Sequence, residues 1–251
     1  MREIGIEELR GLQLEILDYV DGFCRLHCIN YTLSGGTLLG AVRHGGYIPW
    51  DDDIDIQMTR KDYKSFITSW TEENNHPFDL MSLDTRSDYL FPFSKVCDRN
   101  SVLYVGGVPT TGVFIDIFPV DDVSGPFDFF IRHGIVKFMY RLIDHYHRHD
   151  WINIFSNVLS ERKIVSFIDK LSQMRVKAKC EFIFEMTSGL LCKHPIAAEV
   201  FQNYSPISFE NKSYMAVSDY DSYLTSTFGD YMTPPPPGKR ISHHIAKAYK
   251  L

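Results

Sequence analysis

Two runs decide the fold: Leu33-Ser34-Gly35-Gly36-Thr37-Leu38-Leu39-Gly40, and shortly after it Asp51-Asp52-Asp53-Ile54-Asp55-Ile56. A glycine-rich turn is thus followed by four carboxylates within five positions. Like charges so close together repel strongly unless a cation lies among them. Carboxylate oxygens are common ligands of divalent cations, and a glycine turn that exposes backbone N–H groups commonly binds phosphate. The two runs therefore predict a metal-plus-phosphate site, and with it transfer chemistry on a phosphate ester.

The second run has the period of a β-strand. From residue 53 to residue 58 acidic and apolar positions alternate, which is typical of a strand. Asp53 and Asp55 are then expected on one face, with Ile54 and Ile56 turned toward the core. Asp51 joins that face if the strand begins early, and is a further candidate ligand.

A third acid has the same setting later in the chain. Asp116 lies between Ile115 and Ile117 in an apolar run over residues 114–118. An acid at the centre of an apolar strand is costly unless it is paired or binds a metal. If the two strands are neighbours, the three carboxylates form a set of oxygen ligands that suits Mg²⁺ or Mn²⁺. The predicted catalytic and metal-binding residues are Asp53, Asp55 and Asp116.

Two other interpretations of the acidic run are weaker. A calcium loop counted from Asp51 requires glycine at position 6 and glutamate at position 12, where this chain has Ile56 and Asp62. A solvated acidic turn has no reason to alternate with isoleucine.

Hydrophobic periodicity divides the chain into two parts near residue 125. Helices are expected over residues 7–27, 37–42 and 63–70, and strands over 29–34, 53–58, 91–96, 101–105 and 114–118. Three later segments lack strand alternation and are predicted as helices: residues 127–149, 160–186 and 195–204. A run of four prolines at 234–237 is a stiff connector. We therefore expect an α/β (α+β) protein with a catalytic core at 1–125 and a helical region at 126–251, forming one integrated unit.

The overall composition and charge bear on two classes of partner, nucleic acids and membranes. The chain has 251 residues, a net charge of −6 and a pI near 5.9, so nothing suggests a nucleic-acid partner. No basic, apolar leader opens the chain, and charged residues interrupt every apolar run before it is long enough to span a bilayer. We expect a soluble cytoplasmic protein.

The residues around these motifs resemble the LicD family of the nucleotidyltransferase superfamily. These are bacterial phosphocholine transferases related to the fukutin-type phosphoribitol transferases. The matching segments occur in family order at residues 33–44, 48–55, 93–98, 114–119 and 228–232, followed by the proline run, Arg240 and His243-His244. The resemblance implies a nucleotidyltransferase-like mixed sheet.

The resemblance also implies an activity. LicD-like enzymes take phosphocholine from CDP-choline, or a similar CDP-alcohol donor, to a hydroxyl of a cell-surface glycan or glycolipid and release CMP. Lipopolysaccharide, teichoic acid and capsule are the expected acceptors, so peripheral contact with the inner face of the membrane is compatible with this function. Asp53 and Asp55 are then metal ligands and Asp116 is a ligand or the general base. Gly35 and Gly36 offer backbone N–H groups to the phosphates, and Ser34 adds a hydroxyl.

Several cationic residues are candidates for substrate binding. Arg43 follows the glycine turn by one short helix and is either a phosphate clamp or part of a surface salt bridge. Lys95 lies between apolar neighbours, so its charge needs either a substrate phosphate or one of the acids as partner. The family pattern implies that Arg240, His243 and His244 fold back over the pocket, the alternative being a loosely ordered tail.

Two other functions remain open from the sequence. The same fold can transfer phosphoethanolamine, phosphoribitol or a nucleotide, and the motif residues do not choose between these groups. A non-catalytic choline- or glycan-binding module is the other alternative, but it has no use for a set of acids. The sequence makes no prediction of oligomeric state.

Overall fold

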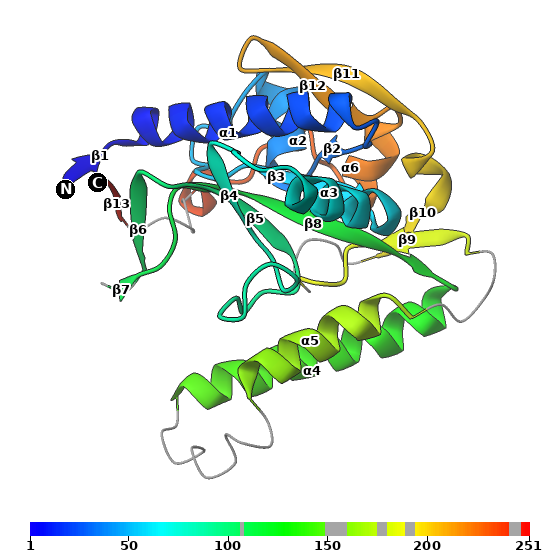
Figure 1. Ribbon diagram of the computed structural model, residues 1–251. Coiled ribbons are helices and arrows are strands. Elements are labelled where there is room, and N and C mark those ends of the chain that lie inside the picture. Colours follow the sequence, from blue (N-terminus) through cyan, green and yellow to red (C-terminus); the bar gives the residue numbers. More distant parts are fainter. Residues whose placement is uncertain (106–107, 149–159, 175–179, 189–193, 241–246) are drawn as a thin grey trace.

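A seven-stranded mixed sheet forms the centre of the protein in the computed structural model (Figure 1). The structure describes residues 1–105, 108–148, 160–174, 180–188, 194–240 and 247–251. The strands of the central sheet are β2 (Thr32–Leu33), β3 (Asp55–Thr59), β4 (Phe78–Met81), β5 (Ser94–Asp98), β8 (Phe114–Val123), β9 (Phe182–Phe184) and β10 (Ile196–Ala197).

Strand β8 organises this sheet. One edge of β8 pairs in parallel with β3, and β3 in turn pairs with β2. The other edge pairs antiparallel with β5 in its first part and with β9 in its last part. In this register Asp116 lies opposite Asp55 on one side and opposite Lys95 on the other. The two acid-bearing strands are therefore neighbours, as the site predicted from the sequence requires.

Four helices lie on one side of the central sheet (Figure 1). They are α1 (Ile6–Leu26), α2 (Gly35–His44), α3 (Arg60–Glu72) and α6 (Tyr220–Phe228). Helix α1 buries one apolar stripe, and its Phe23 ring packs edge-on against Phe66 of α3 and at a tilt against Trp70. Helix α3 begins where the Thr59 hydroxyl accepts a hydrogen bond from the backbone N–H of Asp62, a side-chain N-cap.

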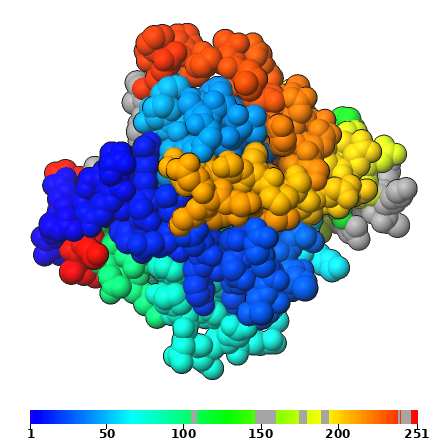
Figure 2. Space-filling view, turned by 90° about the horizontal axis from the view of Figure 1, so that it is seen from above, coloured from blue at the N-terminus to red at the C-terminus, as the bar shows by residue number. Residues whose placement is uncertain are grey.

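Two smaller sheets complete this side of the molecule. Strand β13 (Lys247–Lys250) lies between β1 (Arg2–Ile4) and β6 (Ser101–Val105), with β7 (Val108–Pro109) at the edge, so the two chain ends lie together (Figure 1). The hairpin of β11 (Tyr204–Phe209) and β12 (Lys212–Val217) lies between α1 and α2 on the surface (Figure 2, gold).

Helices α4 (Pro126–Arg148) and α5 (Glu161–Ser172) lie side by side on the other side of the sheet (Figure 1). The buried Arg132 anchors α4 by donating hydrogen bonds to the backbone oxygens of Asp122, Ser172 and Met174 while pairing with Asp128. Among the helices of the described residues, none combines the length and the apolarity needed to cross a bilayer.

The prediction of a helical second half is wrong in part. Helices α4 and α5 are present, but residues 182–184 form β9, and the segment predicted as a helix over 195–204 contains β10 followed by a short 3₁₀ turn, η2 (Ala198–Phe201). Strand β9 exists because its backbone pairs with residues 121–123 of β8, more than fifty positions away. Local apolar spacing does not report such a distant partner. The central sheet therefore contains strands from both sides of residue 125.

Candidate active site

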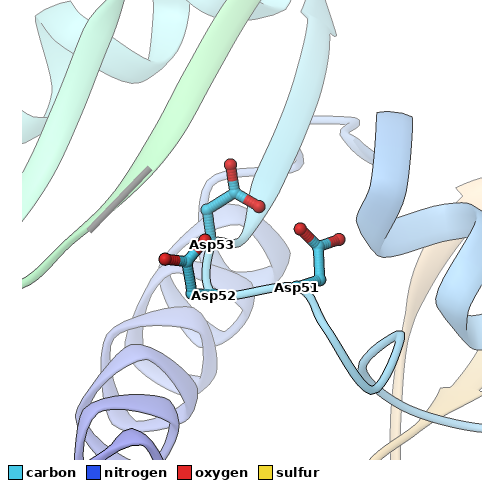
Figure 3. A group of neighbouring side chains, drawn as sticks. All are labelled: Asp51, Asp52 and Asp53. Carbon is cyan, nitrogen blue, oxygen red and sulfur yellow. The ribbon is translucent and has the colours of Figure 1, made fainter. Parts of the chain in front are cut away.

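The first part of the acidic run, Asp51 to Asp53, lies in the loop between α2 and β3, here called the acidic loop (residues 45–54). The carboxylates of Asp51, Asp52 and Asp53 have ligand atoms within 4.8 Å of one another, and among the described residues this is the group of His, Cys, Asp and Glu placed to hold a metal ion. Figure 3 shows the carboxylates of Asp51 and Asp53 turned to the same side of the loop. The sequence predicted Asp51 and Asp53 as ligands but did not predict Asp52.

Asp55 and Asp116 extend this group from the neighbouring strands. The backbone N–H of Asp116 donates to the carbonyl of Ile54 at 2.9 Å, and Asp55 faces Asp116 in the β3–β8 register. Burial raises the pKa of Asp55 well above its usual value, and the charges of Asp53, Asp116 and Asp51 raise it further. The shift therefore has two causes: the burial of Asp55 itself and the nearness of three other carboxylates.

The strand that carries Asp55 begins later than predicted. Strand β3 starts at Asp55, so Asp53 belongs to the acidic loop and the expectation of one continuous strand from residue 53 is wrong. The hydrogen bond that holds Ile54 to Asp116 continues the strand pairing by one position, which keeps Asp53 close to Asp55. Alternation in the sequence extends beyond the strand because the loop also alternates buried and half-buried residues.

Lys95 is paired with one of the acids. Its Nζ lies 2.5 Å from Asp116 Oδ1, and the two side chains are 8% and 14% exposed. The same Nζ lies 3.5 Å from the ring centroid of Phe114 and 5.3 Å from those of Phe91 and Phe93. A cation among aromatic faces is favourable, and the charge also lowers the pKa of Asp55. Of the two partners that the sequence left open for Lys95, the structure shows the acid.

The glycine turn opens α2 directly beside the acidic loop. Gly35 has a φ of +52°, which favours glycine, and a Cβ added to Gly36 would lie 2.5 Å from Asp51 Oδ2. Ser34 occupies the N-cap position, but its hydroxyl is buried and has no hydrogen-bond partner among the described residues. The turn is bonded to β3, because Ser34 N donates to Asp55 O and Asp55 N donates to the Thr37 hydroxyl. A buried hydroxyl and a helix N-terminus therefore lie beside the carboxylates, an arrangement that suits an anion held next to a cation.

Two arginines meet at the other end of α2. Arg43 donates to the carbonyl of Tyr231 at 2.7 Å, and Arg240 lies over the ring of Trp50 at 5.2 Å. Partial burial lowers the pKa of Arg43, and the charge of Arg240 lowers it further, so the two guanidinium groups are close. Within the described residues neither arginine forms a salt bridge with a carboxylate, which is the surface alternative considered for Arg43.

The C-terminal tail therefore returns to the acidic loop. Tyr231 and Arg240 bracket the proline run, and Trp50 immediately precedes Asp51. Figure 2 shows this tail, in orange-red, against α2. The other two residues that the resemblance assigns to the tail, His243 and His244, lie outside the described residues.

The acidic loop is held in place by residues that the sequence analysis did not select. From α1, Arg10 donates to the carbonyl oxygens of residues 48, 49 and 51, and Gln13 donates to the carbonyl of Asp52 at 2.9 Å. From the turn of the β11–β12 hairpin, the Glu210 carboxylate accepts from the N–H of Tyr47. Gln13 did carry a signal, since it is a polar residue within the buried stripe of α1. Arg10 and Glu210 carried none.

The donor set suits a hard divalent cation. All the ligand atoms available are carboxylate oxygens, which Mg²⁺ and Mn²⁺ prefer over nitrogen or sulfur. Five aspartates, at positions 51, 52, 53, 55 and 116, lie on the acidic loop and the strand starts beside it, with Lys95 as a cation among them. Repulsion between these charges would be relieved by a bound cation.

Comparison with known proteins gives a family match over the segment that contains this site. The family model described as "LicD/FKTN/FKRP, nucleotidyltransferase domain" matches residues 28–158, which is more than half of the chain and includes the glycine turn, the acidic loop and β8. The chain belongs to this family. It is a transferase, as the sequence predicted.

Individual relatives extend the match. The chain is 29% identical to "Lipopolysaccharide cholinephosphotransferase LicD" of Haemophilus influenzae over 269 aligned positions, which cover the whole of both chains. It is 46% identical over 54 residues to "Ribitol 5-phosphate transferase FKRP" of Homo sapiens and of Mus musculus, a segment of 22% of this chain and 11% of each relative. This full-length similarity is thus to a cholinephosphotransferase, and these two local similarities are to ribitol phosphate transferases.

Proposed function

We propose that the protein is a metal-dependent transferase that moves phosphocholine from CDP-choline to a hydroxyl of a cell-surface glycan or glycolipid, with release of CMP. The full-length similarity to a lipopolysaccharide cholinephosphotransferase supports this choice of group and acceptor class. We keep the cytoplasm, at the inner face of the membrane, as the proposed location.

One observation carries the proposal. The N-terminus of α2 and the acidic loop lie so close together that a Cβ added to Gly36 would come within 2.5 Å of Asp51 Oδ2. A phosphate bound to the N–H groups of this turn would lie next to the carboxylates, and a phosphate beside carboxylates requires a cation between them. This is the chemical requirement of a nucleoside-diphosphate donor.

Asp53 and Asp55 are the proposed metal ligands, with Asp51 and Asp52 as the further carboxylates of the same group. When bound, Mg²⁺ or Mn²⁺ would neutralise the diphosphate and the charge that develops on the departing CMP. At the turn, Ser34 would donate its hydroxyl, and Gly36 its backbone N–H, to phosphate oxygens. These interactions hold the donor in one orientation, which is the main protein contribution to phosphoryl transfer.

The reaction exchanges one phosphorus–oxygen bond for another. The acceptor hydroxyl oxygen bonds to the phosphorus that carries choline, the bond from that phosphorus to the bridging oxygen breaks, and CMP leaves with the electron pair. The hydroxyl proton goes to a carboxylate, for which Asp116 is our candidate. If Asp116 acts instead as a ligand, the Asp116→Asn variant needs more Mg²⁺ for half-maximal rate. If it acts as the base, that concentration is unchanged and kcat falls.

Arg43 and Arg240 are the proposed clamp for the CMP phosphate. Two guanidinium groups that are close to each other and have no carboxylate salt bridge within the described chain favour a bound anion. Arg43→Lys and Arg240→Lys should each raise KM for the donor, because lysine keeps the charge but cannot form the two-pronged contact.

Phosphoribitol is the second candidate group. The local similarity to ribitol 5-phosphate transferases favours it over phosphoethanolamine and over a nucleotide. The identity of the alcohol depends on side chains that contact the head group rather than on the acids.

The test is a donor panel with CMP release as the readout. The protein is incubated with CDP-choline, CDP-ribitol or CDP-ethanolamine, candidate glycans and Mg²⁺, and in parallel with EDTA. With CDP-choline we expect CMP release and a phosphocholine-modified glycan in the presence of Mg²⁺, and neither product in the presence of EDTA. Asp55→Asn should abolish this release. Turnover with CDP-ribitol in place of CDP-choline would show that the transferred group is phosphoribitol. Full activity in EDTA would contradict the proposed metal requirement.

A further inference from the structure

The α4–α5 pair exposes an unusual concentration of large apolar side chains. The exposed positions, called here the outer face, are Phe127, Phe130, Ile131, Lys137, Phe138 and Arg141 on α4, with Lys163, Phe167, Lys170 and Met174 on or just after α5. Phe127 and Phe130 are 78% and 76% exposed, more than is usual for phenylalanine in a folded domain. Apolar side chains that gather on one surface mark an interaction site.

Helical spacing places these residues on one side of each helix. On α4 the apolar positions 127, 130, 131 and 138 and the basic position 141 recur at intervals of three, four and seven, and so lie along one stripe. The opposite stripe of α4 packs inward, where Phe129 contacts Phe184 of β9 and Val136 is fully buried. On α5 the exposed positions 163, 167, 170 and 174 follow the same rule. The exposed side chains are thus organised, not scattered.

The outer face is basic although the whole chain is acidic. Helices α4 and α5 together carry seven arginines and lysines and four acids, whereas the chain has a net charge of −6. Two of those acids face inward: Asp128 pairs with Arg132 and Asp169 pairs with Arg60. Four cations, at positions 137, 141, 163 and 170, are exposed among the phenylalanines, with Asp144 as the exposed acid of α4. Phenylalanine beside lysine and arginine is the composition of helices that lie at a membrane surface.

The pair is firmly attached to the catalytic part of the protein. Arg132 joins α4 to the end of β8 and of α5, and Arg162 of α5 donates to the carbonyl oxygens of Leu83, Arg86 and Tyr89. The segment that contains Leu83 and Tyr89 leads into β5, which carries Lys95 of the active site. A surface that binds the outer face therefore takes a defined orientation relative to the active site.

We propose that the outer face docks the protein onto an anionic lipid bilayer, with Phe127, Phe130 and Phe138 in the headgroup region and the basic side chains at the lipid phosphates. A second copy of the chain fits less well, because a symmetric contact would bring together two copies of the same basic surface, which carries Lys137, Arg141, Lys163 and Lys170. The proposal does not depend on the identity of the transferred group.

The test is sedimentation of the purified full-length protein with vesicles of phosphatidylcholine, alone or mixed with phosphatidylglycerol. We expect binding to the mixed vesicles, weaker binding at high salt and little binding to phosphatidylcholine alone. Lys137→Gln/Arg141→Gln should weaken binding about 25-fold, from the ~5-fold that each basic residue contributes at an anionic surface. Phe127→Gln/Phe130→Gln should weaken binding to the mixed vesicles as well.

Matched controls remove the same kinds of side chain, two cations or two apolar groups, from other surfaces. Lys61→Gln/Lys64→Gln removes two exposed charges from α3, and Leu26→Gln/Leu251→Gln removes two exposed apolar side chains from other surfaces. Both control variants should bind like the wild type, and all four should keep its thermal unfolding temperature. The proposal is overturned if the wild type does not bind the mixed vesicles, or if control and outer-face variants lose binding equally. It is also overturned if the outer-face variants instead abolish a dimer seen by analytical ultracentrifugation.

Discussion

Replacing Lys95 with methionine should destabilise the protein strongly in the absence of metal. Lys95 Nζ contacts Asp116 at 2.5 Å and counteracts the repulsion that raises the pKa of Asp55. Methionine has a similar length and packs well against the phenylalanine rings around position 95, so the apolar contacts are largely kept. The substitution therefore tests the charge and not the packing.

The structure sets the size of the effect. Removal of one partner from a buried ion pair costs about 3–5 kcal/mol, because the other charge is left uncompensated. The side chains here are 8% and 14% exposed, so residual solvation places the cost near the lower end, at about 3 kcal/mol. For a chain of this size that corresponds to a fall in Tm of about 6–12 °C.

The assay is urea and thermal unfolding in EDTA at neutral pH. Lys95→Arg, which keeps the charge, should lose much less stability. The double variant Lys95→Met/Asp116→Asn should recover part of the loss, since it removes the uncompensated carboxylate. Saturating Mg²⁺ should raise the Tm of Lys95→Met more than that of the wild type. A loss below about 1 kcal/mol, or a double variant as unstable as the sum of the singles, would show that the pair does not neutralise the site.

Three further predictions follow from individual contacts. Between pH 3.8 and the raised pKa of Asp55, the folded state binds more protons than the unfolded state, so the free energy of unfolding should fall as the pH rises through this range. Asp55→Asn should make the free energy of unfolding in EDTA less dependent on pH. The same substitution should raise Tm at neutral pH and abolish transfer. Gly36→Ala would push the Asp51 carboxylate away. It should therefore raise the Mg²⁺ concentration for half-maximal CMP release, with little change in Tm. An unchanged Mg²⁺ requirement would show that Asp51 is not a metal ligand. Arg60→Met, which leaves Asp121 and Asp169 without their shared cation, should cost about 3–5 kcal/mol in urea unfolding, and a near-neutral result would mean that solvent compensates both acids.

Local patterns in the sequence predicted the parts of the site that depend on neighbours along the chain. The glycine turn, the alternation around Asp55 and the apolar setting of Asp116 each follow from backbone geometry within a few residues. The first helix and the strands β2, β3, β5, β6 and β8 were predicted for the same reason, with errors of up to five residues at their ends, whereas β1, β4 and β7 were not predicted.

Other features depended on partners far away in the sequence. Strand β9 exists because β8 offers it a free edge, and the hairpin at residues 204–217 covers the region between α1 and α2. Residues 182–184 form a short apolar run that fits either a helix or a strand, so the spacing of apolar residues alone did not decide between the two structures.

The sequence by itself predicted metal-plus-phosphate chemistry, because an acid among isoleucines is costly unless it is paired or binds a cation, and an exposed glycine turn commonly binds phosphate. Only the tertiary structure decided which side chains share the site. It brought Asp116 opposite Asp55, paired Lys95 with Asp116, and returned Arg240 to Trp50 and Arg43. These are contacts between segments tens to hundreds of residues apart, and they depend on strand register and helix packing rather than on local spacing.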